Sequence, residues 1–183
     1  WEDVQGGPED IVLRLDPGNA FGTGLHPTTQ LALQLLERTR LDGARVLDVG
    51  TGSGVLAIAA ALLGADAVLA VDTSADAVRV AAENARVNGQ EERIKVLAGS
   101  LDVVQALRLP PFEIVVANIV AKVLIELAPA LTAAVAPGGQ LLLSGIIEPA
   151  ELELMLTYAT FGFLPNERQA EGDWRCLRLQ REG

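Results

Sequence analysis

The sequence contains few reactive or aromatic side chains. It has one cysteine, one histidine and 4% aromatic residues among 183. A single cysteine, Cys176, cannot form an internal disulfide, which favours a reducing compartment. Its position in a strand-like alternating run predicts a buried, unreactive thiol. Because half of the residues are hydrophobic, one domain can bury a core without disulfides or metal ions, and we expect no metal site.

Targeting and membrane-spanning segments are also missing. No apolar run reaches the roughly 18 to 20 residues that a transmembrane helix needs, and no stretch has the charged start and apolar centre of a signal peptide. These absences predict a cytoplasmic protein without a membrane partner. The chain begins at Trp1 without a methionine, and we interpret it as a fragment or a trimmed chain.

Basic residues are in the minority, with 14 Lys and Arg against 24 Asp and Glu, a formal net charge of −10. Neutralising phosphates requires a basic surface, so this balance argues against direct nucleic-acid binding. It suits a cationic partner that is attracted over a long range. Solubility alone explains the charge equally well.

From residue 44 onward, strand-like and helix-like segments alternate. Strands are expected at 45–49, 67–72, 93–99, 112–118 and 140–145, and helices at 55–64, 74–89 and roughly 120–135. Strands rich in valine, leucine and isoleucine, separated by helices, predict an α/β fold with a parallel sheet covered on both faces. Two strand-like runs within 161–181 lack an intervening helix and predict an antiparallel hairpin at the sheet edge.

The N-terminal part contains an unusual loop, "DPGNAFGTGLHPTTQ", at residues 16–30. A short strand is expected before it, at 11–16, and a leucine-rich helix after it, capped by Thr28 or Thr29. Glycine, proline, threonine and the only histidine are concentrated here, which marks a ligand-binding segment. A turn is expected at "PGG", residues 137–139.

A glycine-rich loop, "DVGTGSG", follows the strand at 45–49. Ligands of open parallel sheets bind beyond the carboxyl ends of the strands, where glycines allow close backbone approach. The dinucleotide fingerprint requires glycine at the sixth position, where counting from Gly50 places Val55. No Gly-Lys-Ser/Thr follows, so a Walker-type phosphate loop is also excluded.

Two aspartates end or interrupt the first two strands. Asp72 lies 22 residues beyond Gly50, where a carboxylate accepts hydrogen bonds from the ribose hydroxyls of a nucleoside; the alternative is an acidic cap on the next helix. Asp48 is costly to bury unpaired. It either accepts hydrogen bonds from loop amides or lies near the charged amino-acid end of a cofactor.

Two further positions follow strands at the same edge. Ser100 and the adjoining backbone in "AGSL" are expected to contact an adenine edge. Asn118 ends the fourth core strand, where its side-chain carbonyl either accepts a hydrogen bond from a substrate nitrogen or belongs to an ordinary turn.

In order and spacing, these motifs resemble those of class I S-adenosylmethionine-dependent methyltransferases. The segments "DPGNAFGTGLHPTT", "NIVA" and "GDWRCLRLQR" resemble those of the PrmA family in particular. The resemblance implies a Rossmann-like, mostly parallel seven-stranded sheet with helices on both faces and an antiparallel C-terminal hairpin. It implies methyl transfer from S-adenosylmethionine, leaving S-adenosylhomocysteine, to lysine side-chain and N-terminal amines of a basic ribosomal large-subunit protein.

The resemblance also implies site residues. The early loop covers the cofactor in this family, and Asn118 is the catalytic candidate. The cofactor-binding set is Phe21, Thr23, Thr29, Asp48, Gly50, Gly52, Asp72, Ser100, Leu101 and Asn118. His26 either lines the cleft or is hydrogen-bonded within its own loop, and neither position makes it a base.

We expect one methyltransferase domain over 1–183, with an N-terminal strand, covering loop and helix in 1–43 and the core in 44–183. The small substrate-docking domain of the family is expected to be absent, which leaves the target open to another protein or a small-molecule amine. No side chain is an obvious strong base, so water is expected to take the amine proton while Asn118 aims the nitrogen.

Four other functions are possible for a fold of this kind. A methyltransferase acting on nucleic acid conflicts with the net charge, and one acting on glutamine amides lacks the Asn-Pro-Pro-Tyr motif after the fourth core strand. A dinucleotide oxidoreductase conflicts with Val55. A non-catalytic adenosylmethionine-binding module remains an alternative, and a methyl-transfer assay distinguishes it from an enzyme.

Overall fold

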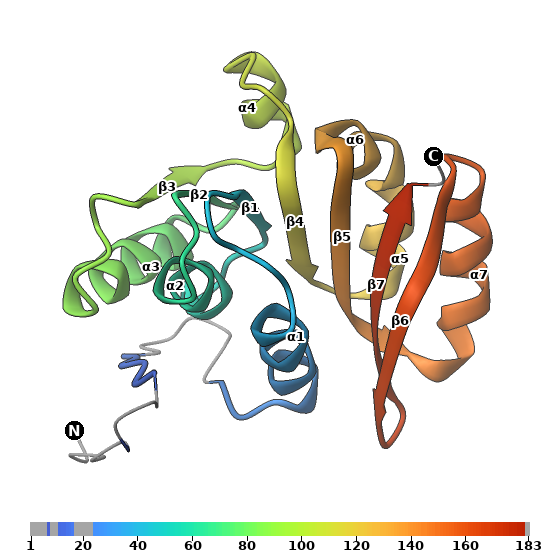
Figure 1. The fold of residues 1–183 in the computed structure, drawn as a ribbon, viewed down its shortest axis with the longest axis horizontal. Coiled ribbons are helices and arrows are strands. Elements are labelled where there is room, and N and C mark those ends of the chain that lie inside the picture. The colour runs from blue at the N-terminus through green and yellow to red at the C-terminus, as the bar shows by residue number, and fades with distance from the viewer. Residues whose placement is uncertain (1–6, 8–10, 17–23, 182–183) are drawn as a thin grey trace.

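A computed structural model describes residues 7, 11–16 and 24–181 and contains a seven-stranded sheet (Figure 1). The strand order is β3-β2-β1-β4-β5-β7-β6. Its strands are β1 (Arg45–Val49), β2 (Ala67–Asp72), β3 (Ile94–Ala98), β4 (Phe112–Asn118), β5 (Val135–Ile147), β6 (Phe163–Glu171) and β7 (Trp174–Arg181). Strands β1 to β5 are parallel, whereas β7 is antiparallel to both β5 and β6. The predicted parallel core and C-terminal hairpin are confirmed.

Helices cover both faces of this sheet. They are α1 (Pro27–Glu37), α2 (Val55–Leu62), α3 (Ala75–Val87), α4 (Leu101–Ala106), α5 (Ala121–Glu126), α6 (Ala128–Ala134) and α7 (Glu148–Ala159). Strand residues alternate between two apolar clusters: Val46 packs with α1 to α3, and its neighbour Leu47 packs with α4 to α7. None of these helices, in the part of the chain that the structure describes, has the length and hydrophobicity to cross a bilayer.

The strand order reverses direction between β1 and β4. The chain proceeds from β1 outward to β2 and β3, then returns to place β4 on the other side of β1. Val49 at the end of β1 pairs with Ala117 near the end of β4. Sheets of this type bind ligands beyond the carboxyl ends of the strands at such a reversal point, and Gly50 and Asn118, the next residues along each strand, lie there.

The expected strand at 11–16 is wrong. Residues 11–16 form no strand; the backbone groups of Arg14 and Asp16 are hydrogen-bonded to the side-chain amides of Asn88 and Asn84 in α3. Alternating apolar residues occur both in strands and in extended segments that lie against a helix, so the pattern alone does not distinguish the two. The predicted threonine cap of α1 is also wrong, because the helix begins at Pro27 with His26 as its N-cap.

Further differences follow from local breakers. The helix expected at 120–135 is divided into α5 and α6 at Leu127, and Pro129 occupies the first turn of α6, where a proline needs no hydrogen-bond acceptor. The expected turn at 137–139 lies inside β5, which pairs irregularly with the start of β4. Helices α4 and α7 were not predicted.

The hairpin strand β7 carries Cys176, which is fully buried. Burial raises the pKa of this thiol to about 12, so it stays protonated near neutral pH. The predicted unreactive thiol is confirmed.

Arg108, which follows the end of α4, adopts the left-handed conformation at φ 48°. A side chain in this region is disfavoured, and glycine is the usual residue at this position after a helix. We expect Arg108→Gly to raise the free energy of unfolding by about 0.5–1 kcal/mol, since the lost strain exceeds the added chain entropy. Urea denaturation measures it. Arg108→Ala keeps the Cβ atom and should not stabilise; equal effects of both substitutions would contradict the explanation.

Candidate functional site

The chain bends sharply after β1, at residues 50–54, and this glycine bend contains three glycines with left-handed backbone. The φ angles of Gly50, Gly52 and Gly54 are 75°, 56° and 84°, a conformation that side chains rarely tolerate. Space is short as well, because a Cβ atom on Gly50 would lie 2.6 Å from Cγ2 of Ile119. The bend therefore presents backbone rather than side chains at the carboxyl end of β1, as the sequence predicted.

Asp72, at the tip of β2, binds this bend. Its Oδ2 accepts a hydrogen bond from the Gly52 amide at 2.9 Å, and its Oδ1 accepts one from the Ser74 amide at 2.9 Å. The bond to the Ser74 amide fits the alternative that the sequence left open, an acidic cap at the start of the next helix. An ionised carboxylate has about four acceptor sites, so two remain for a ligand, and the side chain is partly exposed.

Asp48 is buried behind the bend, with a relative exposure of 1%. Its Oδ2 accepts hydrogen bonds from the Thr51 hydroxyl at 2.7 Å and the Ala57 amide at 3.1 Å. These bonds join the end of β1 to the start of α2. Bonds from loop amides were expected, whereas the donors are a loop hydroxyl and a helix amide. Its Oδ1 has no partner among the described residues. Burial raises the pKa of this carboxyl to about 6, against the hydrogen bonds that lower it.

This carboxyl predicts a pH dependence of stability. Between its ordinary pKa of 3.8 and its folded pKa of about 6, the folded protein holds a proton that the unfolded chain has released. The free energy of unfolding therefore falls as the pH rises through this window, by up to about 3 kcal/mol. Asp48→Asn has no such proton, so its stability relative to the wild-type chain should increase from pH 4 to 7. Parallel urea-derived curves for the two proteins would contradict the shift.

Two hydrogen bonds attach the start of α1 to the carboxyl ends of β4 and β5. The Asn118 Nδ2 donates to the Thr29 hydroxyl at 3.2 Å, and the Ser144 hydroxyl donates to the Thr28 carbonyl at 2.7 Å. Asn118 and Thr29, predicted from separate motifs, thus meet in one place. Asn118 is partly exposed and donates through Nδ2, while its acceptor Oδ1 receives no hydrogen bond from the described residues.

His26 is held within its own loop, as one of its two interpretations expected. Its Nδ1 lies 2.8 Å from the Thr28 hydroxyl and accepts from the Thr28 amide at 3.3 Å. The ring also contacts Trp174 of the hairpin edge-on, with centroids 5.0 Å apart. This contact joins α1 to β7, and nothing in the sequence signalled it.

Gly145, near the end of β5, packs against the backbone of Ile119. Its φ is 83°, and a Cβ atom there would collide with the Ile119 carbonyl oxygen, with its carbonyl carbon only 2.9 Å away. The ends of β4 and β5 thus touch backbone to backbone. This contact fixes the chain one residue beyond Asn118.

The remaining predicted residues have different positions. Ser100 precedes α4; its amide donates to Asp102 at 2.9 Å, while its hydroxyl caps nothing. The Leu101 side chain is 3% exposed and packs in the core, so a ligand contact through this residue stays a prediction for its backbone alone. Phe21 and Thr23 lie outside the described residues and stay predictions.

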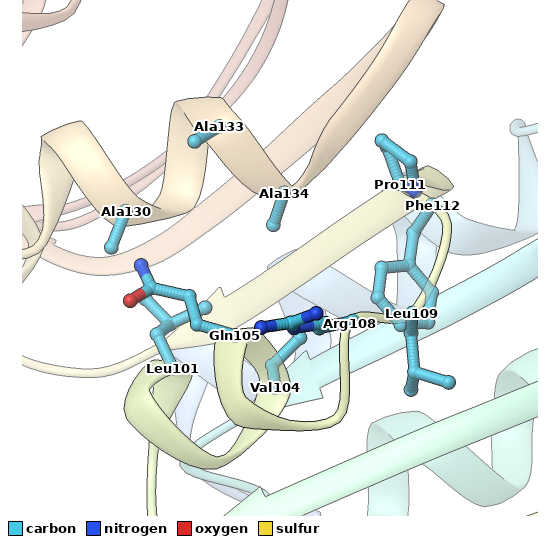
Figure 2. A pocket seen from close by; sticks show the side chains of 10 residues that line it. All are labelled: Leu101, Val104, Gln105, Arg108, Leu109, Pro111, Phe112, Ala130, Ala133 and Ala134. Atoms are coloured by element: carbon cyan, nitrogen blue, oxygen red, sulfur yellow. The ribbon is translucent and has the colours of Figure 1, made fainter.

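Two pockets in the described part of the chain lie away from the glycine bend. A cavity of about 110 Å³ is enclosed by α4, α6 and the start of β4 (Figure 2). A larger pocket of about 550 Å³ is lined by Arg45, Ala67 and Ile94, the first residues of β1, β2 and β3. Ligands of this sheet type bind at the opposite ends of the strands, so neither pocket is the candidate site.

Comparison with known proteins agrees with the geometry. The ribosomal protein L11 methyltransferase of Chloroflexus aurantiacus is 47% identical over 97% of the chain, and the chain spans 60% of that relative's length. The crystal structure of a ribosomal protein L11 methylase from Lactobacillus delbrueckii subsp. bulgaricus superposes with a TM-score of 0.91 at 39% identity, covering 100% of this chain and 92% of that one.

A more distant structure shares the fold. An RNA methyltransferase from Salinibacter ruber, solved in complex with S-adenosyl-L-homocysteine, has a TM-score of 0.66 at 18% identity, covering 84% of this chain and 92% of that one. The family model described as ribosomal protein L11 methyltransferase (PrmA) matches residues 1–182. With that match and the 47% identity, the chain belongs to the PrmA family.

Proposed function

We propose that this chain transfers methyl groups from S-adenosylmethionine to amino groups of ribosomal protein L11, its lysine side chains and N-terminus. Family membership supports the activity and the substrate. The observation that carries the proposal is the junction of Asn118 and Thr29 beside the glycine bend, at the point where the strand order reverses.

The residues present fit the cofactor. Asp72 keeps acceptor capacity for ribose hydroxyls, and Gly50 and Gly52 expose backbone beside it. The Asp48 Oδ1 is a buried acceptor with no partner in the described part of the chain, which suits the positively charged amino-acid end of the ligand. Ser100 and the Leu101 backbone follow β3, where the adenine edge would lie.

When bound, S-adenosylmethionine would supply a methyl group on a positively charged sulfur: a nitrogen lone pair attacks the methyl carbon in line as the carbon–sulfur bond breaks, and S-adenosylhomocysteine leaves as a neutral thioether. The attacking amine must be neutral, yet a lysine near pKa 10.4 is neutral only about once in 2,500 at pH 7. Loss of the amine proton to water precedes attack. The Asn118 Oδ1 then accepts a remaining N–H and aims the lone pair, so that positioning supplies most of the acceleration.

Apolar side chains around this edge favour the neutral amine. Leu25 before α1, Val120 after β4 and Ile147 at the end of β5 are 78%, 63% and 45% exposed. Burying an ammonium group against such side chains lowers its pKa, because desolvation disfavours the charged form. The net charge of −10 attracts a basic protein to the chain over a long range.

The test has two parts. Calorimetry measures binding of S-adenosylhomocysteine, and a radiolabel assay measures methyl transfer to purified L11, with L11 of chemically acetylated amines as the matched control. We expect the chain to bind S-adenosylhomocysteine and to transfer label to unmodified L11 but not to acetylated L11. Absence of binding would overturn the whole proposal. Binding with no label on L11 would overturn the substrate assignment and favour a non-catalytic module or another acceptor.

A further inference from the structure

A buried asparagine in α3 connects two segments that lie far apart in the sequence. Asn84 has no exposed surface. Its Oδ1 accepts from the Asp16 amide at 2.9 Å, while its Nδ2 donates to the Asp16 carbonyl at 3.0 Å and to the Ser53 carbonyl at 2.9 Å. All three bonds go to backbone. One side-chain amide therefore holds the segment at residues 14–16 against the glycine bend.

The Ser53 carbonyl belongs to the bend itself, between Gly52 and Gly54. The Gly52 amide is bound from the other side by Asp72, so the bend is held by a β2 carboxylate and an α3 amide together. Helix α3 also packs closely here, because a Cβ atom on Gly54 would lie 3.1 Å from the Ala81 Cβ. The two side chains and the close packing of α3 together hold the bend in one conformation.

Asn88, one turn further along α3, provides a natural comparison. It makes the same pair of bonds to backbone: its Oδ1 accepts from the Arg14 amide at 2.9 Å and its Nδ2 donates to the Arg14 carbonyl at 2.7 Å. Its third bond goes to the Asn84 carbonyl at 2.7 Å, within the helix. Asn88 thus anchors the same segment without reaching the bend.

We propose that Asn84 is a positioning residue for cofactor binding, which sets the glycine bend and the segment at 14–16 in one fixed relation. It contacts no cofactor itself and acts through the Ser53 and Asp16 backbone. The inference rests on the proposed function, because it takes the bend as the cofactor site. Removing the amide takes away the bond from α3 to the Ser53 carbonyl, while Asp72 and the backbone bonds to Val71 remain. The less ordered bend must then be reordered at each binding event, which costs free energy.

The experiment compares S-adenosylhomocysteine affinity in three chains by calorimetry: wild type, Asn84→Ala and Asn88→Ala. One hydrogen bond is worth up to about tenfold in affinity. We expect Asn84→Ala to weaken binding by about tenfold or more, because it removes three bonds, one of them to the bend. We expect Asn88→Ala to weaken binding by less than about threefold, because none of its bonds reaches the bend. Circular dichroism first confirms that each protein is folded at the assay temperature, so that a loss of global stability alone leaves affinity unchanged.

A second pair of variants covers the case in which Asn84→Ala does not fold. Asp16→Pro removes the amide that donates to Asn84, and Asp16→Ala removes the same carboxylate but keeps that amide. Residue 16 already precedes Pro17, which favours the extended backbone that proline accepts. We expect Asp16→Pro to bind about fivefold more weakly than Asp16→Ala.

Equal affinities within each pair, in a wild-type chain that binds the ligand, would overturn the role of Asn84. A wild-type chain that binds no S-adenosylhomocysteine would instead overturn the proposed function.

Discussion

Asp72→Ala is expected to weaken binding of S-adenosylhomocysteine by about 10- to 150-fold, the range for a hydrogen bond to a charged group at roughly 1.5–3 kcal/mol. Two contributions add. The variant loses the acceptor proposed for the ribose hydroxyls, and it releases the Gly52 amide that the carboxylate holds at 2.9 Å. Calorimetry of the free protein with the ligand measures the change.

The matched control for this variant is Asp76→Ala. Asp76 is exposed in the first turn of α3, so its loss changes the net charge equally and leaves the bend untouched. We expect its affinity to stay within about twofold of wild type, because screened surface charges contribute little. If Asp72→Ala behaves like Asp76→Ala, Asp72 serves only to begin the helix that follows it.

Asn118→Ala is expected to lower turnover by about 100-fold at saturating cofactor, because a small misplacement of the reacting nitrogen costs this much. The variant removes the Oδ1 acceptor and also the bond to Thr29. Rates of methyl transfer to L11 measure the effect, with affinity for S-adenosylhomocysteine recorded in parallel to separate positioning of the amine from loss of cofactor.

Ser144→Ala provides the control at the neighbouring strand. Its hydroxyl also ties α1 to the sheet, by a 2.7 Å bond to the Thr28 carbonyl, but it lacks an atom for the amine. Turnover should stay within about threefold of wild type, because a neutral hydrogen bond at the weak end of its energy range contributes about this factor. A wild-type rate in Asn118→Ala would reduce Asn118 to a turn residue that anchors α1.

The core strands were predictable because a parallel strand buried on both faces is apolar throughout. The ranges 45–49, 67–72 and 112–118 match β1, β2 and β4 residue for residue. Their carboxyl ends then located Asp72 and Asn118 at one edge. Helix α7 was not predictable in the same way, although Pro149 and two acidic residues mark its start, because exposed leucines on its outer face obscure the helical period.

The contacts that join distant segments could not be predicted in this way. Asn84 and Asn88 stand four residues apart on one side of α3, a signal of polar groups facing the protein, but the sequence does not name their partners. The segment at 11–16 alternates like a strand, and only the tertiary structure shows that side-chain amides replace a neighbouring strand. The contact between His26 and Trp174 depends in the same way on the position of the hairpin.

The missing side chain at Gly145 restricts how acceptor choice can change in evolution. A larger residue there would displace Ile119 and, with it, Asn118, which we propose aims the nitrogen, so substitution at Gly145 should be poorly tolerated. Val120 and Ile147 have exposed side chains, and we expect their exchange to leave both strands in place. A library that seeks new amine acceptors should therefore vary these two positions and keep Gly145.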